Sequence, residues 1–368
     1  MSPTSRAVLG WISAIAALFV SFTYMVAMGM ASALVTATQL ASDLMSSSGR
    51  PVLGVFYTYS RDTAFPVRVS LWLLTSVCIL IFVACFAAGL RSRDGFFPSL
   101  KKLSRAGRIT SSSNWLVAMP LISCGLYVVV LVVTLVLELV GVPPGSLCDP
   151  HLNPCPTQAQ LFAGLAYAPV GEELAYRIIT PLGLVIPIRI VWRRLISGQG
   201  PSTSKFLSIT GLSLLSPERA KRKTGYPTFT MNGWSGVHWL EWIFIVVSSV
   251  LFGLAHVESG GGTNWGAGKV VTAAISGFVI AIAFVAYGAY AAILLHWFFD
   301  VYFEISLVGS SVFGEPFSIL PFVFVLTSLI VGTLSVLVVI GWVVRRIIPR
   351  ASPTTYKTPE PKGFPVQA

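Results

Sequence analysis

The sequence predicts an all-α, polytopic membrane protein with about eight transmembrane helices, and its composition is the first reason. Hydrophobic residues make up 54% of the 368 residues and charged residues only 11%, against a charged share of about 25% in typical soluble domains. So few charges cannot cover the surface of a water-soluble protein of this length. The composition therefore excludes a soluble enzyme, a disulfide-stapled secreted domain and a disordered scaffold.

The second reason is the length of the uncharged stretches. A helix needs about 20 apolar residues to cross a hydrocarbon core of about 30 Å. Five stretches without Lys, Arg, Asp or Glu are long enough, namely residues 7–42, 69–90, 109–137, 270–299 and 316–344. The fourth, continued to Val308, is too long for one span, so we expect helices over about 270–287 and 289–308 with a tight turn near Gly288. Two weaker candidates, about 158–178 and 237–256, complete the eight.

The third reason is the distribution of positive charge. With both termini on one side, an even helix count places 20 of the 25 Lys and Arg residues on that side and four on the other. This agrees with the positive-inside rule and predicts cytoplasmic termini, in an integral protein that we expect in the plasma membrane. The net charge of +11 then reflects topology and attraction to anionic lipid, and we expect no nucleic-acid partner.

The predicted organisation has four parts. Residues 1–157 hold helices one to three and their loops, and residues 158–308 hold a core of helices four to seven with a basic cytoplasmic loop at 189–235. Residues 309–350 hold the last helix, and residues 351–368 form a polar tail expected to be disordered. Cys148 and Cys155 flank an outer loop, where a disulfide and metal binding with His151 are alternatives.

Ionisable residues inside spans are expensive and are functional candidates by default. In the fourth helix, Glu173 and Arg177 are four residues apart on one face, which favours an ion pair. Glu172 lies about 100° around the helix and stays available for another role. A salt bridge that only packs helices is the alternative.

Two further patterns place histidines in spans. Phe252 and His256 share a helix face near the end of one span, where a capping role is the alternative. His296 and Asp300 also share a face, with Glu304 one turn on, an arrangement that fixes an imidazole for catalysis or metal binding. A satisfied internal hydrogen bond is the alternative there.

These patterns together offer Glu172, His256, His296 and Asp300 from three helices. A carboxylate can act as general base on a water, and imidazoles can stabilise an oxyanion or ligate zinc. This set suits peptide-bond hydrolysis, while proton-coupled transport is an alternative. The site residues meet only if a helix is kinked or re-entrant, or if the fourth helix continues beyond Ile178.

In order and spacing, the motifs EELAYR (172–177), FGLAH (252–256) and HWFFD (296–300) resemble the CPBP family of intramembrane proteases. That family includes the Rce1-like type II CAAX prenyl endopeptidases and self-immunity (Abi) relatives. The resemblance covers about residues 158–308. Two departures are that Asp300 stands where Asn is common, and that no second histidine closely follows His256.

The resemblance implies an endopeptidase that contacts membrane lipid and cleaves peptides or lipidated, CAAX-type proteins. By matching position, Glu172 would activate water, His256 would assist or bind a metal, and His296 with Asp300 would position the water or form the oxyanion site. Glu173, Arg177 and Phe252 would support the site. Glu172, His256 and His296 match a catalytic zinc set in kind, although no HExxH motif is present; a metal-free glutamate mechanism and a non-catalytic binding or immunity protein are the alternatives.

Overall fold

The computed structural model describes residues 3–49, 68–107, 109–110, 113–146, 155–198, 203–258, 264–315 and 317–347. The expectations for Cys148, for His151 and for a disordered tail at 351–368 lie outside the described residues. Cys155 is disulfide-bonded.

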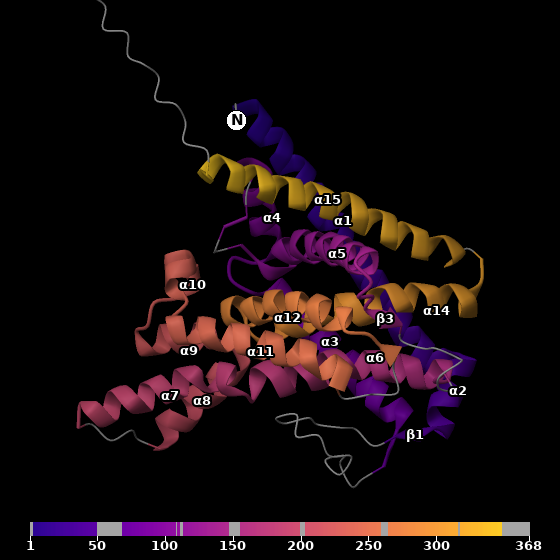
Figure 1. Ribbon diagram of the computed structural model, residues 1–368, viewed down its shortest axis with the longest axis horizontal. Coiled ribbons are helices and arrows are strands. Elements are labelled where there is room, and N and C mark those ends of the chain that lie inside the picture. The colour runs from indigo at the N-terminus through magenta and orange to yellow at the C-terminus, as the bar shows by residue number, and fades with distance from the viewer. Residues whose placement is uncertain are drawn as a thin grey trace, which may run out of the picture.

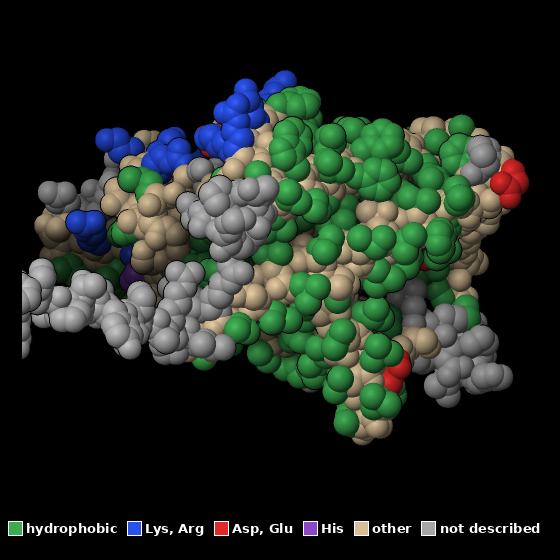
Figure 2. Space-filling model, turned by 90° about the horizontal axis from the view of Figure 1, so that it is seen from above, with side chains coloured by type: hydrophobic (Ala, Val, Ile, Leu, Met, Phe, Trp, Pro, Cys, Tyr) green, Lys and Arg blue, Asp and Glu red, His purple; other side chains and the backbone are tan. Residues whose placement is uncertain are grey.

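Among the residues that the structure describes, eight helical segments are long and apolar enough to cross a membrane, which confirms the predicted fold class (Figure 1). They are α1 (Pro3–Ala37), α3 (Leu71–Leu90), α5 (Trp115–Leu139), α6 with α7 (Gln158–Arg193), α11 (Trp239–Glu258), α12 (Gly268–Tyr287), α13 with α14 (Ala289–Phe313), and η5 with α15 (Phe317–Val344). Much of their outward surface is apolar, as lipid contact requires (Figure 2).

The β structure of the described residues is confined to two short antiparallel pairs. β1 (Ser48–Gly49) pairs with β2 (Val69–Ser70), and β3 (Gly145–Ser146) pairs with β4 (Asn264–Trp265). The second pair ties the segment after α5 to the segment before α12, at one end of the helix bundle.

The expected turn at Gly288 is confirmed. α12 ends at Tyr287 and α13 (Ala289–Trp297) begins directly after Gly288, whose φ is +111°. A Cβ atom on Gly288 would lie 2.7 Å from the carbonyl oxygen of Leu215. Both the backbone conformation and this close approach require glycine.

The fourth span continues beyond Ile178, one of the solutions that the sequence left open. α6 (Gln158–Glu173) passes into a π-helical turn, η2 (Leu174–Ile178), and α7 (Pro181–Ile196) follows after a break of two residues. Proline at the first position of α7 is favourable, because its missing N–H would have no helical partner there. The span is therefore long but bent close to the Glu172–Glu173 pair.

Residues 189–235, expected as a basic loop, are instead mostly helical. α7 runs to Ile196, and α8 (Thr203–Leu215), α9 (Pro217–Thr224), α10 (Phe229–Asn232) and the 3₁₀ turn η3 (Gly233–Gly236) follow. Polar composition did not indicate these helices, in which some of the charges are buried and bonded. Lys221 on α9 pairs with Glu241 on α11 at 2.6 Å, and this contact fastens the segment to the bundle. The amphipathic helices α2 (Gln39–Ser46) and α4 (Phe96–Ala106) lie in other connections.

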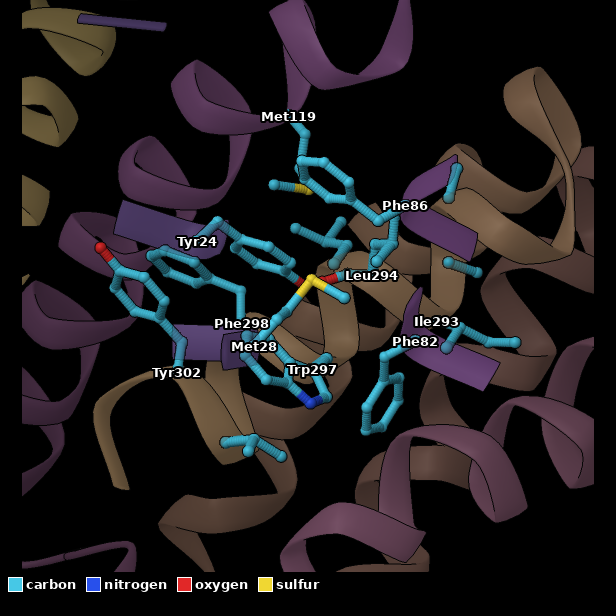
Figure 3. Packing of buried hydrophobic residues seen from close by; sticks show 14 of the residues in the cluster. Tyr24, Met28, Phe82, Phe86, Met119, Ile293, Leu294, Trp297, Phe298 and Tyr302 are labelled. Carbon is cyan, nitrogen blue, oxygen red and sulfur yellow. The ribbon is translucent and has the colours of Figure 1, made fainter. Parts of the chain in front are cut away.

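An aromatic core surrounds α13 and the π-helical turn η4 (Phe298–Tyr302) that separates it from α14 (Phe303–Phe313). Figure 3 shows Trp297 packed among side chains of α1 and α3, with its ring centroid 4.7 Å from that of Tyr24 and 5.5 Å from that of Phe82. The Tyr24 hydroxyl donates to the carbonyl oxygen of Leu294 at 2.6 Å. Dense packing of this kind fixes the rotation of α13 and hence the direction in which the neighbouring His296 points.

Candidate active site

The first half of the site lies at the junction of α6 and η2. Glu173 ends α6, and Arg177 lies in the π-helical turn that follows. Arg177 Nη1 donates to Glu173 Oε1 at 2.9 Å, and both side chains are fully buried. The predicted ion pair is therefore present. A buried ion pair repays the desolvation of its charges only when further hydrogen bonds satisfy them, so its other contacts matter.

Arg177 is held from two more directions by the neighbouring helices. Its Nη2 donates to the carbonyl oxygen of Gly277 on α12 at 3.2 Å, and its guanidinium lies 4.2 Å from the ring centroid of Phe252 on α11. A Cβ atom on Gly277 would come within 2.9 Å of both Arg177 Nη2 and Phe252 Cδ1. Gly277 is thus a site residue that the sequence analysis missed, because its role is only to allow a close approach.

His296 on α13 joins the two acids of α6 to Asp300. Its Nδ1 lies 2.8 Å from Glu173 Oε1, within hydrogen-bond distance. Its Nε2 lies 3.2 Å from Asp300 Oδ2 and 3.6 Å from Glu172 Oε2. Asp300 belongs to the π-helical turn η4. Glu173 directly precedes one π-helical turn, and Asp300 lies within the other. Turns of this kind are frequent at functional sites.

Glu172 and Glu173 are adjacent in sequence but have different surroundings. The Glu173 side chain is fully buried, whereas that of Glu172 is 30% exposed. Glu172 Oε2 accepts no hydrogen bond from the described residues, although it faces His296. Glu173 Oε2 also lacks a donor among the described residues, so the two acids differ mainly in access. Glu173 is committed to Arg177 and His296 inside the protein, whereas the Glu172 side chain is partly exposed to a reactant.

His256 faces the same region from α11, with Phe252 between it and His296. Its Nδ1 lies 2.8 Å from the carbonyl oxygen of Phe252. A carbonyl only accepts, so Nδ1 carries the hydrogen and Nε2 of the neutral ring keeps its lone pair. The Phe252 ring meets both imidazoles edge to face, with centroid distances of 4.7 Å to His256 and 5.5 Å to His296. Phe252 therefore spaces the two histidines.

Lys269 is a second residue near the site that sequence reasoning missed, because it was assigned only to an outer segment. It lies in the first turn of α12, with Nζ 4.0 Å from a ring centroid of Trp265. It is close enough to Glu172, Asp300 and His256 to interact with them electrostatically. The sequence around Lys269 does not indicate that it lies near these residues, because this proximity depends on the packing of α11 against α12.

The donor arrangement does not fit the zinc set expected from Glu172, His256 and His296. Among the described residues, no group of three or more His, Cys, Asp and Glu side chains is arranged to hold a metal ion. Both ring nitrogens of His296 already face carboxylates, whereas Nε2 of His256 keeps its lone pair.

One comparison with known proteins finds a match. Residues 156–302 match the family model for type II CAAX prenyl endopeptidases, Rce1-like. The matched segment contains all three motifs and extends from the residues before α6 to the end of η4. No curated protein and no solved structure matches the chain.

Proposed function

We propose that this chain is an intramembrane endopeptidase in which Glu172 activates water. The match of residues 156–302 to the Rce1-like type II CAAX prenyl endopeptidase family, whose members are proteases, supports this proposal. The substrates of this chain are membrane-associated proteins or peptides, including prenylated CAAX-type tails. The observation that carries the proposal is the partly exposed Glu172 side chain, whose Oε2 lies 3.6 Å from His296 Nε2 and accepts no hydrogen bond from the described residues.

In the proposed reaction, Glu172 removes a proton from water while the water oxygen attacks the carbonyl carbon of the scissile peptide bond. The tetrahedral intermediate collapses as the C–N bond breaks, and Glu172 returns the proton to the leaving amine. Water is consumed, one carboxylate and one amine are produced, and Glu172 ends in its initial state. His296, next to Glu172 and Asp300, and His256, through Nε2, would orient the water and stabilise the oxyanion.

Glu173 and Arg177 act as positioning residues in this proposal. Glu173 holds His296 through Nδ1, which aims Nε2 at Glu172 and Asp300. Arg177 in turn fixes Glu173 and contacts Phe252. A neighbour that bonds one ring nitrogen of a histidine sets the chemistry of the other nitrogen, so Glu173 contributes without touching the substrate.

The direct test is peptide cleavage by purified protein in nanodiscs, with farnesylated and unmodified C-terminal peptides. Glu172→Gln keeps the shape of the side chain but removes the base, so we expect kcat to fall about 10²- to 10⁴-fold. Glu138→Gln is the matched control, because Glu138 is an exposed acid at the end of α5. The proposal is wrong if wild type cuts neither peptide class, or if Glu172→Gln cuts as fast as the control.

A chelator titration tests the donor arrangement separately. Since the described donors do not form a three-ligand set, we expect activity to survive in protein that elemental analysis shows to be free of zinc. Loss of activity on chelation and its recovery with added zinc would contradict this expectation and restore the zinc set of Glu172, His256 and His296.

A further inference from the structure

Two adjacent cavities of opposite character lie away from the catalytic motifs, where α7, α8 and α9 pack together (Figure 1). The first, of about 860 Å³, has a mainly apolar lining from α7, α8 and the beginning of α11, including Leu184, Ile188, Trp192, Phe206 and Trp239. The second, of about 850 Å³, has a basic and hydroxyl-rich lining, including Arg193, Lys205, Lys223, Ser208 and Thr224. Arg193 and Tyr226 line both cavities.

We propose that the two cavities together bind one anionic phospholipid, with the phosphate headgroup in the basic cavity and the acyl chains in the apolar cavity. The cavities are adjacent, since Arg193 and Tyr226 line both, and a ligand that occupies both must carry an anion and a hydrocarbon within the same molecule. Each volume lies within the range of about 300–1,000 Å³ that is usual for ligand pockets.

The position of the cavities fits a membrane lipid. The span containing α7 ends at Arg193, and the span of α11 begins at Trp239, so the site lies where helices leave the hydrocarbon. Trp192 and Trp239 are 68% and 62% exposed, and exposed tryptophans at this depth are typical of the membrane–water interface. Figure 2 shows the visible Lys and Arg side chains gathered toward one end of the molecule.

The charges of the site call for an anion from outside the protein. No Asp or Glu occurs among the described residues that line either cavity. Two nearby acids are already bonded: Glu218 accepts hydrogen bonds from the backbone N–H groups of Phe229 and Thr230, and Glu241 pairs with Lys221. Arg193 and Lys223 therefore meet no carboxylate among the described residues that line either cavity.

Tyr226 orients Arg193, which lines both cavities, and Arg189, which lines the apolar cavity beside it. The Arg189 guanidinium lies 4.4 Å from the Tyr226 ring centroid and that of Arg193 lies 5.9 Å away. An aromatic face holds a guanidinium by cation–π attraction and leaves its edge donors directed outward. A phosphate group is the ligand that such a fork of donors matches best.

The test uses native mass spectrometry to measure which lipids the protein retains after it is extracted from nanodiscs. The nanodiscs contain equal amounts of phosphatidylglycerol and phosphatidylcholine. Wild type should retain one phosphatidylglycerol in preference to phosphatidylcholine. Each basic residue near the surface is worth about a fivefold change in anionic lipid binding, so Arg193→Gln with Lys223→Gln should lower the retention ratio about 25-fold. The matched control removes two exposed charges of α4, Lys101→Gln with Arg105→Gln, and should leave the ratio within about twofold.

A second variant separates a lipid from a free phosphate. Thr210→Trp fills the apolar cavity and should abolish retention of phosphatidylglycerol, while binding of inorganic phosphate, followed by calorimetry, stays at the wild-type level. Arg193→Lys keeps the charge but not the fork of donors, so it should retain more lipid than Arg193→Gln and less than wild type. Equal unfolding midpoints of the glutamine variant and wild type would show that the loss does not come from misfolding.

Several results would overturn the proposal. One is a wild type without preference between the two lipids, and another is an equal loss in the α4 control. Retention that survives Thr210→Trp would place the lipid elsewhere. Binding of inorganic phosphate without lipid retention would assign the site to a soluble phosphate compound. None of these outcomes depends on whether the protein cleaves peptides.

Discussion

Two buried ion pairs, Glu173–Arg177 and Lys221–Glu241, resemble each other in burial and length but differ in their further partners. Each is at most 1% exposed, with N–O distances of 2.9 and 2.6 Å. The partners of Lys221–Glu241 are backbone groups: Lys221 donates to the Gly236 carbonyl at 2.9 Å, and Glu241 accepts from the His238 N–H at 2.7 Å. These bonds fasten α9 and η3 to the start of α11.

The further partners of Glu173–Arg177 include titratable side chains. Glu173 contacts His296, which in turn faces Glu172 and Asp300. The same type of pair thus closes a structural contact at one place and orients a reactive group at the other. The Glu173–Arg177 pair leads through His296 to the partly exposed side chain of Glu172, whereas the Lys221–Glu241 pair leads only to backbone groups.

The largest expected difference comes from breaking each pair. Arg177→Met leaves Glu173 buried without its partner, which should cost about 3–5 kcal/mol of unfolding free energy and lower cleavage per folded molecule by about 10² or more. Lys221→Met should cost a similar free energy but leave cleavage per folded molecule unchanged. Denaturant unfolding in micelles and active-site-normalised kcat measure the two effects. Equal loss of kcat in both variants would remove the distinction.

Replacing both partners of each pair should separate stability from chemistry. Lys221→Met with Glu241→Leu removes both charges, and such exchanges are often neutral or stabilising by about 1–4 kcal/mol. Glu173→Leu with Arg177→Met should recover stability in the same way but stay inactive, because His296 loses its anchor. Unfolding midpoints and cleavage rates provide the comparison, and an active second double variant would show that Glu173 does not position His296.

Gly277→Ala tests the close approach behind Arg177. The added Cβ would lie 2.9 Å from Arg177 Nη2 and from Phe252 Cδ1, and overpacking of this size costs about 1–3 kcal/mol. We expect kcat to fall, because both displaced side chains support the histidines. Gly164→Ala on α6 is the control, since its Cβ would meet no atom within 4 Å. The interpretation does not hold if the two variants are equally active and stable.

The smallest effect concerns His238, which lies just before α11. Burial, followed by the nearby Arg189 charge, lowers the pKa of His238 below its usual 6.5. Because the folded protein binds this proton less readily than the unfolded chain, the contribution of neutral His238 to the free energy of unfolding is present above pH 6.5. It is lost as the pH falls through the lower pKa of the folded state. Arg189→Gln should raise this pKa, which an NMR titration of the ring can follow. An unchanged pKa would show that Arg189 does not act on His238.

Much of the fold could be predicted from the sequence, because the bilayer imposes strong constraints. The uncharged stretches give eight spans, and Gly288 marks the turn between α12 and α13. The family resemblance carried by the three motifs is confirmed over residues 156–302. The helices within 189–235 were missed, since polar composition indicates water exposure on average but does not reveal a buried pair such as Lys221–Glu241.

For the candidate site, sequence by itself determined which residues carry chemistry and which of them share a helix face. The spacing of four residues is enough to join Glu173 to Arg177 and His296 to Asp300, because local helical geometry fixes it. Only the tertiary structure decided that Glu173 is buried against His296 while the Glu172 side chain stays partly exposed. That choice depends on the rotation of α6 against α13, on the two π-helical turns and on the space left by Gly277. Packing between distant segments sets all three, and no local pattern encodes them.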